Sequence, residues 1–299
     1  MPTCLLGLGS NLGDREATLR AALDEIDALP NVRLSRHSQW HRTAPIGGPN
    51  DQEAFLNAAA VVDSTIPPLA FLENLQRIES RHGRHRTGRW AARTLDIDLL
   101  LYGDALIETP VLTVPHLRMT FRRFVLQPAA EIAPKTIHPV IGWSIERLLL
   151  HLNAARNQAV ILSPSEALRT KLADRVAERF AAQRVERPAF KTADQLWPPD
   201  YSTWLAFESP ASPAVPARTK STKLAYAAAE FPKLTVLLDG EDDAPRAVKS
   251  QWSAIVRQPG RGPTLRLQLA DPAAIEVEVV AAIESVWPDL GPAGGNRIE

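Results

Sequence analysis

Apolar positions in the first half of the chain repeat with two periods, one typical of strands and one typical of helices. Short apolar runs predict strands, and longer stretches with apolar residues three or four positions apart predict amphipathic helices. Asp14 is placed to cap the first helix, and Pro67 and Pro68 fit the first turn of the second. The strands are expected at 4–9, 32–41, 55–63 and 95–101, and the helices at 15–29 and 67–83.

The resulting order, β-α-β-β-α-β, is that of a ferredoxin-like split βαβ sheet with its helices on one face. An α+β fold is therefore expected for this half of the chain. Each helix is expected to turn one apolar stripe toward the sheet. The stripes are Leu19, Ala22, Ile26 and Leu29 in the first helix, and Leu69, Leu72, Leu75 and Ile78 in the second.

Two carboxylates distinguish the last of these strands, where Asp96 and Asp98 alternate with aliphatic residues. Alternation points both carboxylates to one face of the strand and the aliphatic side chains to the other. The carboxylates should lie roughly 7 Å apart, a separation that two Mg²⁺ ions about 4 Å apart can bridge. Four arginines between residues 84 and 93 would then meet the phosphates held by such ions. Taken without the neighbouring motifs, the pair is better explained as the ordinary polar face of a half-exposed strand.

Composition excludes several classes of protein. The 34 basic and 34 acidic residues balance, which argues against a nucleic-acid or membrane-surface protein, because both rely on a large positive field. Cys4 is the only cysteine, so a disulfide framework and a cysteine-ligated metal are excluded, and Cys4 is expected in the core. No stretch has the composition of a signal peptide or a membrane span. We expect a cytoplasmic protein.

The two halves of the chain differ in their charged residues. All seven histidines lie at or before His151, and Lys135 is the only lysine in the first 160 residues. The first half therefore relies on arginine, whose planar fork suits bidentate phosphate contacts. A length of 299 residues also favours two domains. We place them at 1–157 and 158–299, and we expect the Pro-rich segment 198–221 to be a long surface loop.

Six short motifs, taken in order, resemble those of a known family. They resemble the 6-hydroxymethyl-7,8-dihydropterin pyrophosphokinases, folate-pathway enzymes that move diphosphate from ATP to a pterin alcohol. A single D-x-D arises by chance in a chain of this length, whereas six ordered motifs are specific. Together they cover residues 4 to about 155. The motifs are Gly9–Leu12, Arg42–Pro45, Phe55–Ala58, Arg89–Leu100, Thr113–His116 and the pair Arg122 and Phe124.

The resemblance implies a metal and phosphate site. Asp96 and Asp98 would hold two Mg²⁺ ions that bridge the triphosphate of ATP. Arg84 and Arg93 would stabilise the charge that shifts toward the AMP leaving group, and these four residues would be the catalytic ones. The remaining ATP contacts implied by the resemblance are Gln76, Glu79, Arg86, Arg89, Trp90, Thr113, His116 and Arg122.

The resemblance also implies a pterin site. Phe55 and Phe124 would stack on either side of the flat ring. Asn57 and the segment with Thr43, Ala44 and Ile46 would bind its edge. The substrate's hydroxymethyl oxygen attacks the β-phosphorus, so no protein nucleophile is needed. Each residue also has a plainer alternative: the two phenylalanines as core aromatics and His116 as a capped loop residue.

Some positions depart from the family pattern. The Arg-rich loop is a residue short, Val111 stands where some members have an arginine, and Leu117 replaces an aromatic residue beside His116. These changes bear on adenine affinity and on closure of the loop over ATP, and not on the type of reaction.

The second half has a weaker resemblance, to deoxynucleoside kinases. Residues 158–187 predict a strand, a loop, a long amphipathic helix and a second strand, and further strands are expected at 232–239 and 265–269. The phosphate loop is missing, because residues 163–170 read SPSEALRT and contain neither its glycines nor its lysine. We expect a degenerate P-loop-kinase-like α/β domain that serves folding, dimerisation or regulation. An unrelated α/β domain is the alternative.

Three functions follow for the whole chain. The first is Mg²⁺-dependent diphosphate transfer from ATP to the pterin, with these small molecules as its partners. The second is a regulatory or scaffold protein that binds nucleotide and pterin without turnover. The third is RNA binding by 77–93, which the neutral charge and the adjacent carboxylates oppose.

Overall fold

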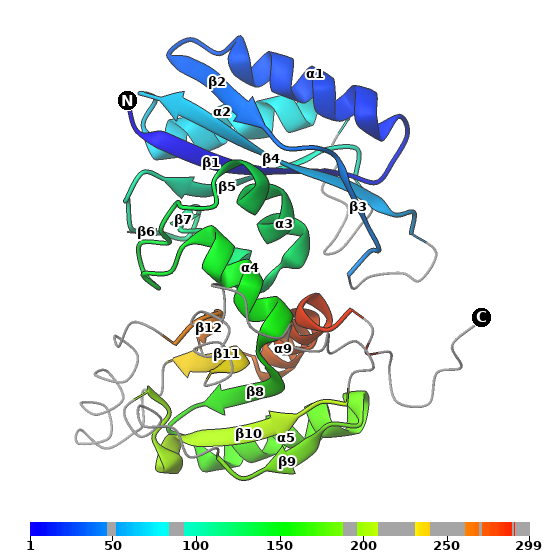
Figure 1. Cartoon of the computed structure of the whole chain (residues 1–299), viewed down its shortest axis with the longest axis vertical. Helices are drawn as coiled ribbons and strands as arrows, with labels where there is room; N and C mark the ends of the chain where they lie inside the picture. Colours follow the sequence, from blue (N-terminus) through cyan, green and yellow to red (C-terminus); the bar gives the residue numbers. More distant parts are fainter. Residues whose placement is uncertain are drawn as a thin grey trace, which may run out of the picture. The chain divides into compact units, whose positions relative to one another are not determined.

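The structure is a computed structural model, which describes residues 1–46, 52–83, 93–187, 196–208, 231–239, 261–268, 271–288 and 290. The chain divides into two compact units, 1–146 and 147–299, and the division falls within helix α4 (Ile145–Ala154) (Figure 1). Each unit is described by itself. No helix in the described ranges combines the length and the apolar character needed to cross a membrane.

The first unit is built on one antiparallel sheet. Its order is β2-β4-β1-β5, with the short strand β3 paired to β4. Helices α1 and α2 cover one face, and α3 packs against β4 on the other (Figure 1). This succession confirms the predicted β-α-β-β-α-β order of a ferredoxin-like sheet. The elements are β1 (Thr3–Ser10), α1 (Arg15–Asp27), β2 (Val32–His37), β3 (His41–Thr43), β4 (Phe55–Ser64), α2 (Pro68–Arg81), β5 (Asp96–Tyr102) and α3 (Arg123–Ile132).

The core under the two helices confirms one predicted stripe and corrects the other. In α1, Leu19, Ala22 and Ile26 are buried as expected. In α2, Leu69 is 47% exposed, and the buried stripe contains Phe71 instead. Phe71, Leu75 and Ile78 follow the i, i+4, i+7 spacing of one helical face. Leu69 lies off that face, so the expected stripe was wrong at its first residue.

The expected single strand over 32–41 is interrupted. β2 ends at His37, and β3 begins again at His41. Ser38 still bonds β4, because its amide donates to the Ala59 carbonyl at 2.9 Å and its hydroxyl accepts from the Ala59 amide at 3.0 Å. Trp40 then turns toward the α1 side, where it packs on the core and stacks with His37. The break separates β3 as a short strand of its own.

A connecting region leads from β5 to the end of the first unit. It holds β6 (Ile107–Glu108), β7 (Thr113–Val114) and the short 3₁₀ helix η1 (Met119–Phe121). The amide of His116 donates to the Leu100 carbonyl at 2.9 Å, so this region runs along β5. Helix α3 begins at Arg123.

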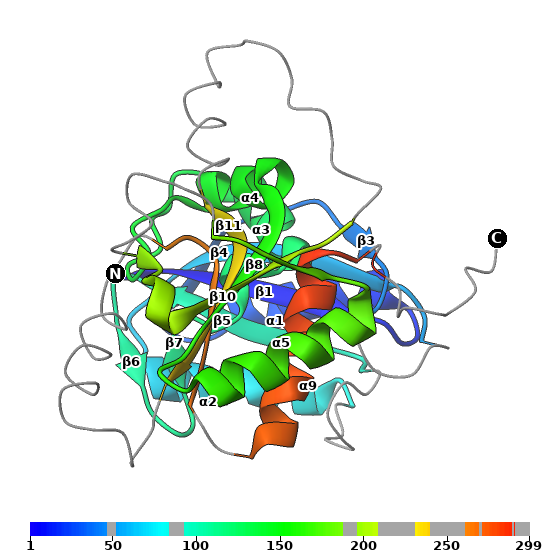
Figure 2. The same cartoon turned by 90° about the horizontal axis from the view of Figure 1, so that it is seen from below.

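The second unit contains a mixed sheet of order β12-β11-β8-β10-β9. β8, β11 and β12 are parallel, whereas β10 is antiparallel to both β8 and β9. Figure 2 shows α5 and α9 side by side, joined by the ion pairs Arg175–Glu276 and Arg179–Glu284. The elements are β8 (Arg156–Leu162), α5 (Glu166–Phe180), β9 (Gln183–Val185), η2 (Pro199–Tyr201), β10 (Ser202–Ala206), β11 (Pro232–Asp239), β12 (Thr264–Gln268) and α9 (Pro272–Val286).

Two expectations for this unit can be compared with its sheet. The strands predicted from 158–187, 232–239 and 265–269 are present, and the unit is of the α/β kind. However, the expected P-loop-kinase-like fold would have a mainly parallel sheet, and in this sheet β10 lies antiparallel to β8. The start of the expected surface loop 198–221 was also wrong. Residues 199–206 form η2 and β10, in which Trp204 and Leu205 are buried, and 209–230 lie outside the described residues.

Candidate active site

The carboxylates of β5 lie on the face of the sheet opposite α1 and α2. Asp96 and Asp98 alternate with buried Ile97 and Leu99, which belong to the core under the helices. The carboxylate side chains keep 24% and 32% of their surface exposed. The predicted division of the strand into a polar and an apolar face is therefore confirmed.

Two glycines of β1 form the floor beside these carboxylates. Gly9 pairs with Asp96 and Gly7 with Asp98, so both glycines lie on the carboxylate face. A Cβ atom added to Gly9 would stand 3.0 Å from Asn57 Oδ1, and one added to Gly7 would stand 3.4 Å from Leu100. Because neither glycine has a side chain, this face of β1 carries no side-chain atoms at residues 7 and 9. The closest neighbour is at Gly9, where Asn57 Oδ1 leaves little room for a Cβ atom.

Arg93 is fixed at the entrance to β5. Its guanidinium donates to Asp96 at 2.7 Å. Its backbone is tied to Asn11, whose Oδ1 accepts from the Arg93 amide at 2.8 Å and whose own amide donates to the Arg93 carbonyl at 3.2 Å. Asn11 also reaches Gln52 and the Glu53 carbonyl. Through its backbone and its side chain, buried Asn11 thus joins the end of β1 to the segment before β4 and to the start of β5.

Two nitrogen-bearing side chains face the carboxylates from the region after β5. His116 Nε2 lies 4.0 Å from Asp98. Burial lowers the pKa of His116 to about 4, against the opposing effect of Asp98, so the imidazole is neutral at pH 7. Burial also lowers the pKa of Arg122 to about 10, which leaves the guanidinium charged. From this region, Arg122 therefore presents a cation to the carboxylates and His116 a neutral ring.

Arg122 carries an unused donor. Its side chain lies over the Phe124 ring at 5.4 Å. Its Nε is buried and has no hydrogen-bond partner among the described residues. A buried donor without an acceptor is unfavourable, so an anionic group is expected to complete it.

A second group of predicted residues surrounds the end of β4. Phe55 and Asn57 alternate with Leu56 and so lie on the face that carries the two carboxylates. Asn57 donates through Nδ2 to Thr43 Oγ1 at 2.8 Å, which joins β4 to β3. Ala44 and Ile46 follow directly after β3, and Phe124 lies in the first turn of α3. The structure thus brings the residues predicted for the flat ring together around β3, β4 and α3.

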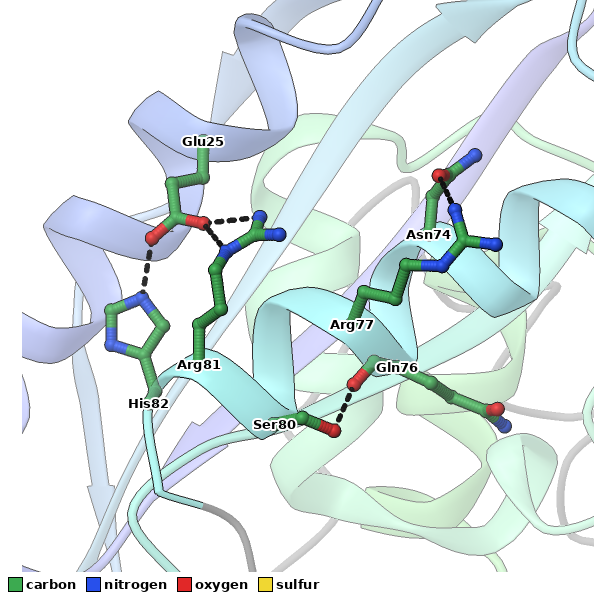
Figure 3. Close-up of polar contacts among 7 residues, drawn as sticks. All are labelled: Glu25, Asn74, Gln76, Arg77, Ser80, Arg81 and His82. Carbon is green, nitrogen blue, oxygen red and sulfur yellow. Dashed lines mark hydrogen bonds and ion pairs between the residues drawn. The ribbon is translucent and has the colours of Figure 1, made fainter.

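The predicted residues of α2 lie differently. Glu79 is 2% exposed and accepts the amide of Ile97 at 2.7 Å, so it covers the outer edge of β5. Figure 3 shows Gln76 directed away from the group formed by Glu25, Arg81 and His82. In that group Glu25 accepts from Arg81 at 2.8 Å and from His82 at 2.9 Å, which fastens the end of α2 to α1. Contact of Gln76 and Glu79 with ATP stays a prediction.

Four predicted residues lie outside the described residues: Arg84, Arg86, Arg89 and Trp90. Thr113 is described and lies in β7, partly buried.

The carboxylate pair fits a divalent ion that a phosphate helps to bind. Within the described ranges no group of three or more histidine, cysteine or acidic residues gathers as a metal site. Mg²⁺ commonly takes one or two carboxylates, with substrate phosphates and water as its other ligands. Asp96 and Asp98 supply the two carboxylates. The Nε of Arg122, which has no hydrogen-bond partner among the described residues, favours an anion nearby. The donors present therefore suit a metal–phosphate complex.

Comparison with known proteins matches the same part of the chain. The model of the family 7,8-dihydro-6-hydroxymethylpterin-pyrophosphokinase (HPPK) matches residues 5–134. A pyrophosphokinase for 2-amino-4-hydroxy-6-hydroxymethyldihydropteridine from Haemophilus influenzae is 43% identical over 139 residues, which are 46% of this chain and 86% of that protein. The protein of the same name from Pseudomonas aeruginosa is 45% identical over 129 residues, 43% of this chain and 79% of the relative. The chain belongs to the HPPK family.

Among solved structures, a wild-type HPPK-DHPS of Plasmodium falciparum is similar to this chain at a TM-score of 0.38 and 14% identity. The similarity covers 60% of this chain and 42% of that one. So low a score carries no weight for the fold, which rests on the sheet order. The HPPK family model ends at residue 134, so it does not match the second unit.

Sequence reasoning assigned no role to three residues that shape the HPPK site. Gly9 and Asn11 lie in the motif Gly9–Leu12, and Gly7 lies two residues before it. The alternation of Gly7 and Gly9 along a buried strand was the signal available, because alternate glycines bare one face of a sheet. The partners of Asn11 had no signal, since they lie more than 40 residues away along the chain.

Proposed function

We infer that this chain transfers diphosphate from ATP to the hydroxymethyl group of 6-hydroxymethyl-7,8-dihydropterin, a step of folate biosynthesis that yields AMP and the pterin diphosphate. Family membership supports the reaction. The observation that carries it in the structure is the carboxylate pair beside Gly7 and Gly9, next to buried Arg122, whose Nε has no hydrogen-bond partner among the described residues.

Asp96 and Asp98 would hold Mg²⁺, and we propose two ions. When bound, Mg²⁺ neutralises the triphosphate oxygens and orients the β-phosphorus for displacement. Arg93 already bonds Asp96, so it stands within reach of phosphate oxygens held at that carboxylate. Arg122 offers its Nε as a further donor, and its burial makes a charge-assisted bond to phosphate strong. Arg84, Arg86, Arg89 and Trp90 complete this proposal from the segment between α2 and β5.

The pterin would lie between Phe55 and Phe124, with its edge toward Asn57 and the residues after β3. Aromatic faces suit a flat ring. The bond from Asn57 to Thr43 holds the carboxamide in one orientation, which favours a single set of ring contacts. The floor at Gly9 leaves room beside Asn57 that a side chain would fill.

In the reaction the hydroxymethyl oxygen attacks the β-phosphorus, and the bond from that phosphorus to the oxygen bridging the α- and β-phosphates breaks. AMP leaves with the electron pair of this bond, and the hydroxyl proton passes to water. The protein contributes position and charge, which are the main needs of phosphoryl-type transfer.

The test is an assay of the full chain with ATP, Mg²⁺ and the dihydropterin, in which AMP and the pterin diphosphate are separated by chromatography. AMP should form only when the pterin is present and should stop on addition of a chelator. ATP binding without any AMP would contradict the proposal and would favour the regulatory or scaffold function.

For the second unit we propose a degenerate nucleoside-kinase-like domain without phosphate-loop chemistry. The turn from β8 to α5 supports this, because Arg169 Nη1 donates to the Ser163 carbonyl. The cation nearest the usual position of the P-loop lysine is thus bonded to the turn itself. Phosphorylation of a deoxynucleoside by the full chain would contradict the proposal. Dimerisation through 158–299 is a further proposal, to be measured by light scattering.

A further inference from the structure

Glu131 lies near the C-terminal end of α3 and is not among the residues assigned to ATP or pterin. Although its side chain is 36% exposed, both of its oxygens are used. Oε1 accepts from the Gln39 amide at 3.0 Å, and Oε2 lies 3.0 Å from His41 Nε2. The next residue, Ile132, accepts through its carbonyl from Arg36 Nε at 2.7 Å. The end of α3 therefore has three bonds to residues 36–41, the stretch that runs from the end of β2 to the start of β3.

That segment leads directly into the pterin side of the site. His41 pairs with Asn57 and Thr43 pairs with Phe55, so His41 and Thr43 share one face of β3. They lie two residues apart, which is about 7 Å along a strand. A contact that fixes His41 therefore acts two residues away from Thr43, whose hydroxyl accepts the hydrogen bond from Asn57.

β3 needs such a hold because it has little support of its own. It is three residues long and, among the described strands, pairs only with β4. A strand this short at the edge of a sheet has few backbone bonds to fix it. The chain has already left the ladder between Ser38 and His41, and Glu131 bonds the residues on both sides of Trp40.

On α3 the same residue is aligned with Phe124. Phe124 and Glu131 are seven residues apart, so they lie on one helical face, about 10 Å from each other along the axis. The opposite side of α3 is fixed in the core by Val125, Leu126 and Ala129. Glu131 therefore connects a fixed helix that carries one aromatic wall to a weakly held strand that carries the other side of the site.

We propose that Glu131 is a positioning residue for the pterin, which holds β3 against α3 so that the Thr43–Asn57 pair faces Phe124 at a fixed separation. This rests on the proposed function. The contacts of Glu131 with His41 and Gln39 do not touch substrate, so the effect is expected in pterin binding and not in the transfer itself. The neighbouring bond to His41 also lowers the pKa of Glu131, in keeping with a firmly bonded carboxylate.

The experiment compares Glu131→Ala with Glu131→Gln in the full chain. The alanine variant should raise KM for the pterin about tenfold and leave KM for ATP and kcat within about twofold, since a displaced wall weakens ground-state binding. The glutamine variant keeps an acceptor for the Gln39 amide and should stay within about threefold of the wild type. Pterin affinity by fluorescence titration, with a non-hydrolysable ATP analogue present, should change in parallel.

A matched control is Glu178→Ala, because Glu178 is likewise a carboxylate on a helix surface, 3.7 Å from Arg175, and lies in the second unit. It should leave both KM values unchanged. Hydrogen exchange at the Gln39 amide should become faster in Glu131→Ala only. If Glu131→Ala does not fold, His41→Gln removes the imidazole from the other side of the contact and should also raise KM for the pterin alone.

An unchanged pterin KM in Glu131→Ala would overturn the proposal, and so would equal increases in both KM values. A wild-type chain that forms no AMP would instead contradict the proposed function. The ratio of pterin affinities between variant and wild type would still decide the role of Glu131 in that case.

Discussion

The first strand and helix of each unit are built alike and differ in what stands at their junction. β1 leads into α1 through a turn capped by Asp14, and β8 leads into α5 through a turn capped by Ser165. In the first unit Gly7 and Gly9 leave one face of the strand low. In the second, β8 reads RNQAVIL and carries no glycine. A strand, a capped turn and a helix are thus common to both, and a candidate site accompanies only one of them.

The arginines at the two junctions differ in the same sense. Arg93 and Arg122 face the carboxylates of β5. The Nε atoms of Arg122 and Arg169 are both buried and have no hydrogen-bond partner among the described residues, so the two arginines do not differ in this respect. Arg169 is 5% exposed, and its Nη1 bonds the Ser163 carbonyl of its own turn. The difference between the two sets of arginines is therefore the carboxylates beside Arg93 and Arg122, which could hold a metal ion and its phosphate.

The largest expected effect is at the carboxylates. Asp98→Asn should reduce kcat for pterin-dependent AMP formation about 10³-fold, because loss of a metal ligand removes several kcal/mol of transition-state stabilisation. Asp96→Asn should do the same and also leave Arg93 without its carboxylate partner. AMP production at saturating Mg²⁺ measures both, with thermal unfolding as the control for folding. Activity within tenfold of the wild type would remove these residues from the metal site.

At the second junction the expected effect is on stability alone. Arg169→Ala should lower the free energy of unfolding by about 2 kcal/mol, because the Ser163 carbonyl loses its bond inside the protein. Pterin-dependent AMP formation should not change. Arg175→Ala is the matched control, since its ion pairs are exposed and contribute under about 1 kcal/mol. A loss of nucleotide binding in Arg169→Ala would show that this turn does hold a ligand.

The two glycines of β1 allow a finer test of the space in the first unit. Gly9→Ala should raise KM for the pterin about tenfold, because its Cβ would stand 3.0 Å from Asn57 Oδ1 and displace that group. Gly7→Ala meets only the side chain of Leu100, at 3.4 Å, which can adjust. Its KM should stay within about twofold. Steady-state kinetics of the two variants measures both KM values. Equal increases in the KM for the pterin would mean that Gly9 does not act through Asn57.

The sequence predicted those features that depend on local spacing. The order of elements in the first unit and the common face of Asp96 and Asp98 both follow from periods of two and 3.6 residues. The roles of the site residues rest on the family motifs and stay predictions until they are measured.

Features that depend on distant partners were missed. The break between β2 and β3 involves Glu131, which bonds Gln39 across 92 residues, and no local pattern indicates it. Residues 199–206 were taken for a loop because prolines surround them, although Trp204 and Leu205 of β10 are buried. Tertiary burial outweighed local composition there. The stripe of α2 failed at Leu69 because two apolar faces compete in that helix and only contact with the sheet selects one.

The smallest expected effect is at Asp63, a carboxylate at the end of the sheet opposite Asp96 and Asp98. It accepts from Arg33 at 2.8 Å, from Thr3 at 2.9 Å and from Ser35 at 3.0 Å. These bonds, that of Arg33 foremost, lower the pKa of Asp63 to about 2. Because the pKa is lower in the folded state, the stabilisation is complete above the ordinary value near 3.8 and is lost as the pH falls toward 2.

Asp63→Asn should therefore cost about 1 kcal/mol at pH 7, an amount limited by the exposure of Arg33, and nothing near pH 2. Urea unfolding followed by circular dichroism between pH 2 and 7 measures the difference. A constant difference across this range would mean that lost packing, and not the charge, explains the variant. AMP formation should be unchanged, because a carboxylate whose oxygens are fully bonded to its own sheet has no capacity left for a metal. Unchanged AMP formation in Asp63→Asn, beside its loss in the Asp96 and Asp98 variants, would show that carboxylates at the two ends of this sheet have different roles because they have different partners.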